Sequence, residues 1–324
     1  MSHSEPATEQ SHRLPLTRPT KGSDAARAWL IGLLAGVLGL SPWWITGARL
    51  PLQNLWATQV WPDHMPLALL PLSQYELTTI VALLTVGGAA AGLSIRIWSP
   101  ARRRLVTWCG VGGVFTVQLV ATIQSFSVLH QGLAPGSMSS LYFGGLLAGV
   151  IGSMVAALVA LVLISSRSTV KATIGCGLMA VPLTSWAVEW VVGVMGYINV
   201  PTAVPSIARW VPAILAGCAL AWCGFLPARR LVAWVLNLAF LWVIPALFTS
   251  VQYVLGTRVS AGDLPEMLLM SRQILAATLG PDGGALPTLL LAVVIGLLGV
   301  GVRAVVSRRR SRQGVDSTGL AADS

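Results

Sequence analysis

The sequence PARRRLVTW at 100–108 decides the fold, because a related string, PARRLVAW, occurs again at 227–234. Each string is a proline-led cluster of arginines that opens directly into a long apolar segment. In membrane proteins, basic clusters between apolar segments mark loops on the cytoplasmic side. The residues predicted to set the topology in this way are Arg102, Arg103, Arg104, Arg229 and Arg230.

The composition around these strings is that of a membrane protein. Of the 324 residues, 55% are hydrophobic and 10% are charged, and the mean hydropathy is +0.74. Soluble domains have about 25% charged residues. One transmembrane helix needs about 20 apolar residues, so the chain has room for several. We therefore expect an all-α integral membrane protein in which the helix bundle is itself the domain.

Eight apolar segments are long enough to cross a bilayer. They lie at 27–46, 76–97, 105–129, 141–164, 173–195, 207–226, 231–255 and 286–306. Only Arg49, Arg209, Arg258 and Arg272 fall on the outer side, and the other 17 of the 21 Lys and Arg fall inside. The positive-inside rule then places both termini in the cytoplasm.

The two arginine strings each fall in the middle of a set of four segments. Weaker echoes occur in the same order along the chain: LSPW at 40–43 resembles LTSW at 183–186, and Gln124 and Gln252 each shortly precede an aromatic residue and Val-Leu. We therefore predict a parallel 4+4 tandem repeat. Its halves are 25–168 and 169–306, and disordered cytoplasmic tails are expected at 1–24 and 307–324.

Two outer loops are long enough to carry structure of their own. The loop at 48–74 is rich in Trp and Pro and is typical of an interfacial or re-entrant segment. In the loop at 256–284, Asp263, Pro265 and Glu266 form a helix-capping pattern before an apolar face. This pattern predicts an amphipathic helix at about 263–279 on the outer membrane surface. Both loops are candidate docking surfaces for a membrane-protein partner.

Glu189 is the one acidic residue well inside a predicted span, and Trp186 and Trp190 flank it on the same helix. A carboxylate at membrane depth is costly and indicates a functional site with a partner. Arg209 lies at the same distance from the hairpin centre and is the expected partner. The functional interpretation is a substrate-binding or proton-coupling group, and the structural alternative is an ion pair that locks the hairpin.

Polar residues at the outer face are weaker candidates for chemistry. An acid or base for a lipid-linked substrate needs such groups to converge. Loop residues of these types are more often simply solvated. The weaker outer-face candidates are Asp63, His64, His130, Gln124 and Gln252.

Several classes of site are missing from the sequence. It has no phosphate-binding loop of the Walker type, no His-Glu-x-x-His and no Gly-x-Ser-x-Gly, and its four cysteines form no Cys-x-x-Cys pair. We therefore expect no metal, no cofactor and no catalytic residue. Because the net charge of +10 is concentrated on the inner side, its expected partner is anionic lipid headgroups and not nucleic acid.

Three functions fit this sequence. The favoured one is a permease or transport component for a lipophilic or lipid-like substrate. The alternatives are a non-catalytic membrane subunit that anchors or stabilises an envelope complex, and an outer-face enzyme acting on a lipid-linked substrate. An excess of 19 arginines over two lysines is typical of GC-rich bacterial genomes, so we expect the protein in a bacterial cytoplasmic membrane.

Overall fold

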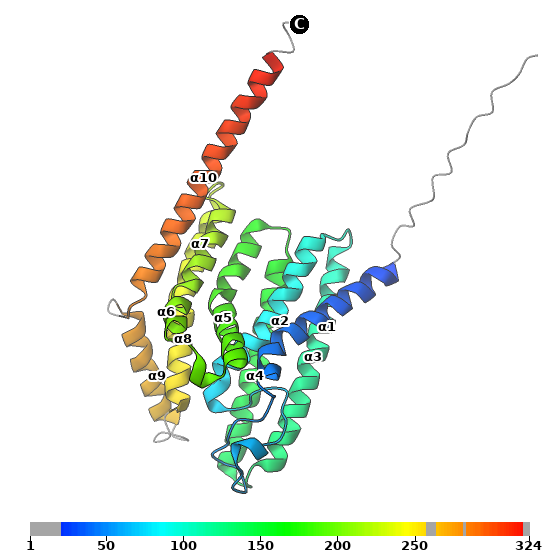
Figure 1. Ribbon diagram of the computed structural model, residues 1–324, viewed down its shortest axis with the longest axis vertical. Helices are drawn as coiled ribbons and strands as arrows, with labels where there is room; N and C mark the ends of the chain where they lie inside the picture. The colour runs from blue at the N-terminus through cyan, green and yellow to red at the C-terminus, as the bar shows by residue number, and fades with distance from the viewer. Residues whose placement is uncertain (1–20, 257–263, 281–282, 320–324) are drawn as a thin grey trace, which may run out of the picture.

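The computed structural model describes residues 21–256, 264–280 and 283–319, shown in Figure 1. Within these residues the chain is helical, and its only β pairing is two isolated bridges, Arg49 with Leu67 and Trp56 with Leu133. Eight helical segments are long and apolar enough to cross a membrane, which confirms the predicted number. The chain is thus an all-helical, multi-pass membrane protein.

The first four spans are single helices that alternate in direction. They are α1 (Lys21–Ile45), α2 (Leu77–Trp98), α3 (Arg103–Gly132) and α4 (Ser137–Ser165). Short 3-10 helices lie in the loop before α2, namely η1 (Pro62–His64) and η2 (Gln74–Glu76).

The last four spans are less regular. They are α5 (Thr169–Met195), α6 (Ala203–Ala208) with α7 (Val211–Cys223), α8 (Arg229–Gly256) and the first part of α10 (Leu286–Gly319). Two elements lie between spans: η3 (Tyr197–Asn199) and α9 (Leu264–Leu279). The sixth span, predicted as one helix, is interrupted between α6 and α7. Both arginine strings lie at one end of the bundle, in the α2–α3 and α7–α8 connections, and we call this the arginine end (Figure 1).

Helix packing follows a definite scheme. Among the first four spans, α2 packs most closely on α4, and α1 packs on α3 and on α2. Among the last four, α7 packs on α10, and α5 packs on α8 and on α7. The two sets meet where α5 packs against α2, α4 and α1.

Small residues make the closest of these contacts possible. Gly88 of α2 lies directly against the backbone of Ala157 in α4, so that a Cβ at position 88 would collide with it. A Cβ at Gly217 of α7 would lie 2.9 Å from the carbonyl oxygen of Ala292 in α10. Close backbone approach of this kind is how helices associate tightly in lipid.

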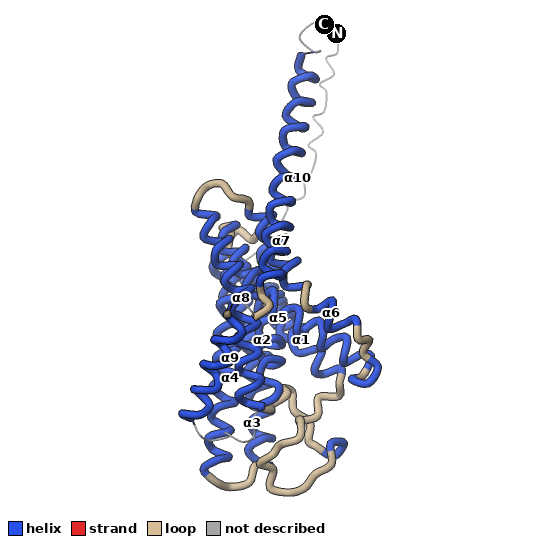
Figure 2. Tube along the Cα trace, turned by 90° about the vertical axis from the view of Figure 1, so that its left-hand side faces the viewer, coloured by secondary structure: helices blue, strands red, loops and turns tan. Residues whose placement is uncertain are grey.

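Two predicted features differ in detail from the structure. The helix predicted at 263–279 is present as α9, but it runs alongside the end of α8 as a helical hairpin instead of lying across the ends of the spans (Figures 1 and 2). The hydroxyls of Ser250 and Ser271, 2.9 Å apart, join the two helices. Of the tails predicted to be disordered, residues 21–24 belong to α1 and residues 307–319 to α10, and the remainder lies outside the described residues.

Candidate functional site

Glu189 and Arg209, predicted to be partners, face different neighbours. Glu189 lies on α5 and is half-buried. Its carboxyl group lies beside the Thr79 hydroxyl and near Glu76. The guanidinium of Arg209 stacks on the ring of Trp210, 5.4 Å from its centroid. The neighbours that the structure gives each of these two residues do not include the other, and counting residues from a hairpin centre predicts depth but not direction.

Trp186 and Trp190 lie where α5 meets the first four spans. The indole N–H of Trp186 donates to the carbonyl oxygen of Gly39 in α1 at 2.9 Å. The two indole rings meet edge to face, 6.0 Å between centroids. The indole N–H of Trp190 is buried and has no hydrogen-bond partner. These tryptophans therefore join the two sets of spans.

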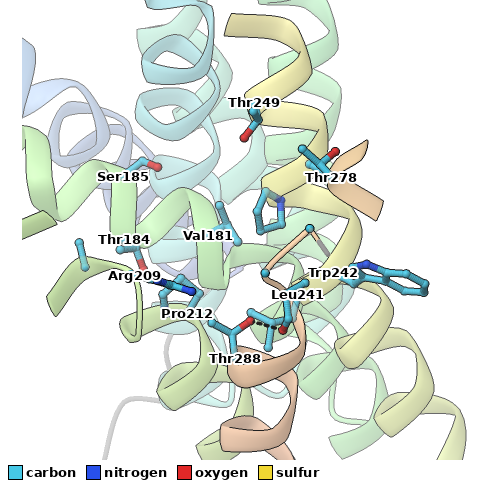
Figure 3. A pocket seen from close by; sticks show the side chains of 16 residues that line it. Val181, Thr184, Ser185, Arg209, Pro212, Leu241, Trp242, Thr249, Thr278 and Thr288 are labelled. Atoms are coloured by element: carbon cyan, nitrogen blue, oxygen red, sulfur yellow. Dashed lines mark hydrogen bonds between the residues drawn. The ribbon is translucent and has the colours of Figure 1, made fainter. Parts of the chain in front are cut away.

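Arg209 lines a cavity of about 330 Å³ that opens among the last four spans (Figure 3). The walls come from α5, α8, α9, the α6–α7 break and the start of α10. The lining residues are Val181, Thr184, Ser185, Ala208, Arg209, Pro212, Leu241, Trp242, Pro245, Ala246, Thr249, Thr278, Gly283, Gly284, Ala285 and Thr288. Arg209 is exposed as a residue, and it contributes the one cationic group to a wall of apolar groups and hydroxyls.

The helix break places Arg209 in this wall. Arg209 is the C-cap of α6, and α7 begins two residues later at Val211 with Pro212 in its first turn. Proline is favoured in a first helical turn because it lacks the N–H that would be unpaired there. The N-terminal end of α7, which carries a partial positive charge, therefore borders the cavity beside the guanidinium.

Hydroxyl groups supply the remaining polar surface. Thr184 donates to the Ala180 carbonyl oxygen at 2.8 Å, and Thr288 donates to that of Ala285 at 2.7 Å. A hydroxyl that donates to its own helix keeps its oxygen as an acceptor. In Figure 3, Thr249 and Thr278 approach the cavity from the side opposite Arg209.

Proline weakens the helices around the cavity. Pro182 lies inside α5 and Pro245 inside α8, and Pro245 has no N–H to bond the carbonyl of Leu241. Irregular backbone at membrane depth is tolerated where it borders a cavity. The chemistry of the site suits an elongated apolar molecule with an anionic group near Arg209.

The sequence did not single out most of this cavity. Of the stronger predicted residues, only Arg209 lines it, whereas Glu189, Trp186 and Trp190 lie at the contact between α5 and the first four spans. Prolines inside apolar segments, each followed by a hydroxyl residue, occur in two walls of the cavity, Pro182 with Thr184 and Pro245 with Thr249. The same pattern in Pro42 of α1 and Thr46 lies outside the cavity, so this pattern alone does not find the site.

Gln124 and Gln252 make structural hydrogen bonds. Gln124 of α3 binds the backbone of the loop at 48–74 through both ends of its amide group. Gln252 of α8 donates to the Thr78 hydroxyl of α2 at 2.9 Å, which links the two sets of spans. The two glutamines occupy corresponding positions in the predicted repeat, but they bind different parts of the protein.

The remaining outer-face candidates are exposed. Asp63 and His64 lie in η1, and His130 lies in the last turn of α3, with its ring 5.9 Å from that of Phe143. Within the described residues, no group of three or more His, Cys, Asp or Glu side chains could hold a metal ion. The topology-setting arginines lie in the α2–α3 and α7–α8 connections and the first turns that follow them.

No family model, curated protein or solved structure matches this chain.

Proposed function

We propose that the protein is a permease or transport component for a lipid-like substrate with an anionic group, and that the substrate binds in the cavity at Arg209. The observation that carries this proposal is the guanidinium in the wall of an apolar, hydroxyl-bearing cavity of about 330 Å³. A cation at membrane depth is costly unless it meets an anion or water. An anionic headgroup supplies that partner while the apolar wall holds the acyl part.

The interrupted sixth span supports a transport role. Transporters commonly build substrate sites from discontinuous helices whose N-terminal ends point at anionic groups. Here the N-terminal end of α7 and Arg209 lie together at the cavity. Two positive features acting on one point favour an anion over a neutral lipid.

The proposed architecture is the parallel tandem repeat with the arginine end in the cytoplasm. The packing scheme supports it, because α2 on α4 corresponds to α7 on α10, and α1 on α3 corresponds to α5 on α8. The basic residues at the arginine end favour this orientation by the positive-inside rule. Both termini then lie in the cytoplasm of a bacterial cell, and the cavity opens toward the outer leaflet.

Glu189 is the proposed coupling residue. It lies at the contact of α5 with α2, where Thr79 and Glu76 are its polar neighbours. A relative movement of the two sets of spans would change the surroundings of this carboxyl group, and with them its affinity for a proton.

The test is binding and transbilayer movement of a fluorescent phosphatidylglycerol in liposomes containing the purified protein. Arg209→Gln should weaken binding at least about tenfold and slow the movement in proportion, because a charged hydrogen bond is lost. Arg272→Gln is the matched control, since Arg272 on α9 is exposed, as Arg209 is, but does not line the cavity. Equal binding by the Arg209 variant and the unchanged protein would refute the proposal.

A second function, a non-catalytic subunit of an envelope complex, is favoured by the loop at 48–74. This loop is folded around buried Leu50, Met65 and Leu70, yet its Trp61 is 77% exposed. An exposed aromatic on a rigid loop is typical of a protein contact. Purification in mild detergent distinguishes the two functions. If a stoichiometric partner copurifies with the protein and is lost in the Trp61→Ser variant, the subunit function replaces the permease function.

A further inference from the structure

Arg103 carries buried donor groups that no other described residue satisfies. It is the first residue of α3, and its Nε and Nη2 atoms are buried with no hydrogen-bond partner. Donors without partners are costly to bury, but Arg103 as a whole is only half-buried, so water reduces that cost. A group that satisfies these donors has an energetic advantage at this position.

The charges around Arg103 increase this cost. Arg96 and Arg167 are the charged groups that act on it, and both are positive. Arg96 is itself occupied, since it donates to the carbonyl oxygen of Ser166 and stacks 4.9 Å from the ring centroid of Trp222. The local excess of positive charge thus lies on Arg103 and its immediate neighbours.

A hollow of about 640 Å³ lies over these residues. It is lined by Ala101, Arg102, Arg103, Arg104, Leu105 and Arg167. Four of its six lining residues are arginines, and the N-terminal end of α3 adds its partial positive charge. Arginine binds phosphate through paired N–H groups, which makes this donor set well suited to that group.

We propose that this hollow is a binding site for a phosphate group, and that the Arg103 guanidinium turns outward into it to become the central ligand. The group belongs either to an anionic lipid of the adjacent leaflet or to a soluble phosphate compound, and the donor chemistry is the same for both. The site lies at the arginine end, in the first four spans, and does not depend on the function proposed for the Arg209 cavity.

The second arginine string supplies a contrast. Arg229 is the first residue of α8, as Arg103 is of α3, but it is exposed. Beside it, Phe225 stacks on Trp234 with centroids 4.2 Å apart, and the indole N–H of Trp234 donates to the Gly224 carbonyl oxygen at 3.2 Å. The groups beside this second string thus bind one another, through a stacked ring pair and a hydrogen bond to the backbone.

The experiment measures thermal unfolding of the full chain in a neutral detergent, with each ligand added at constant ionic strength. The probes are inorganic phosphate, mixed micelles with phosphatidylglycerol and mixed micelles with phosphatidylcholine. The unchanged protein should be stabilised by a phosphate-bearing anionic probe and not by phosphatidylcholine. Stabilisation by phosphatidylglycerol alone identifies a lipid headgroup, whereas equal stabilisation by inorganic phosphate identifies a soluble compound.

Two variants make the test specific. Arg103→Gln should weaken binding of the active probe at least about tenfold, equivalent to about 1.4 kcal/mol, whereas Arg229→Gln should leave it unchanged. Without any anion, Arg103→Gln should be at least as stable as the unchanged protein, because it removes a half-buried cation that is repelled by Arg96 and Arg167. The proposal is overturned if both variants respond alike, if no anionic probe stabilises the protein, or if Arg103→Gln is the less stable protein without anion.

Discussion

The side-chain amide of Gln124 binds Leu69 as a neighbouring peptide group would: its Oε1 accepts from the Leu69 N–H at 2.9 Å. Its Nε2 donates to the carbonyl oxygen of Leu67, also at 2.9 Å. One side chain of α3 thus satisfies two backbone groups of an extended segment that has no β-sheet around it. The adjacent Ser125 hydroxyl accepts from the Leu70 N–H at 2.8 Å and continues the pattern.

Gln124→Leu should lower the free energy of unfolding by about 2–4 kcal/mol, because it leaves a backbone donor and an acceptor without partners. Unfolding in a denaturing detergent, followed by circular dichroism, measures the change. Gln252→Leu is the control, since it removes one bond to Thr78 from an exposed side chain and should cost about 1 kcal/mol or less. Equal effects of the two substitutions would contradict this role for Gln124.

Gly88→Ala should destabilise the protein by about 1–3 kcal/mol, because the new methyl group collides with the backbone of Ala157 and pushes α2 from α4. Gly144→Ala, on α4 with nothing within 4 Å of its added Cβ, should be neutral or slightly stabilising. The same unfolding assay applies. A neutral Gly88 variant would show that the α2–α4 contact is not tightly packed.

Trp186→Phe keeps an aromatic ring but removes the hydrogen bond to Gly39, so it should cost about 1 kcal/mol. Trp108→Phe, at an exposed position on α3, should have no measurable effect. Because Trp186 joins α5 to α1, limited proteolysis of the α4–α5 connection at 166–168 should also become faster in the Trp186 variant alone. Unchanged proteolysis would argue against this joining role.

Thr249→Trp should abolish binding of the anionic lipid although Arg209 remains, because the larger side chain fills part of the cavity. Thr116→Trp, an exposed position on α3, is the control for introducing tryptophan into a span. Native mass spectrometry of lipid retained after mild delipidation counts the bound molecules. Retention by the Thr249 variant equal to that of the unchanged protein would place the lipid elsewhere.

The spans were predictable because each is a physical requirement visible in one segment: an apolar stretch long enough to cross the bilayer. The helix at 263–279 was also predictable from one segment, because Asp263, Pro265 and Glu266 are local signals for the start of a helix. Directions of side chains were not. The sequence predicts similar depths for Glu189 and Arg209, but in the structure Arg209 lines the cavity and Glu189 has Thr79 and Glu76 as neighbours.

The cavity and the arginine hollow depend on contacts between distant segments. Nothing near Thr288 in the sequence indicates that it lines the same cavity as Arg209, and the two arginine strings look alike although only Arg103 has buried, unpaired donors. The folded loop at 48–74 likewise required Gln124, a residue 50 positions beyond its end, to supply its hydrogen bonds. Such relationships arise from three-dimensional packing and leave no local pattern.

The hydrogen bonds of the loop at 48–74 also make one part of the protein stiffer than the other. Trp43 of α1 donates to Ala68, Gln124 of α3 binds Leu67 and Leu69, and Tyr142 of α4 donates to Gln53. Bending among these three helices would break several bonds at once. Pro245 leaves the Leu241 carbonyl without its helical bond, so α8 resists bending less at this point. The loop bonds therefore hold α1, α3 and α4 together at one end, whereas Pro182 and Pro245 weaken the helices around the Arg209 cavity.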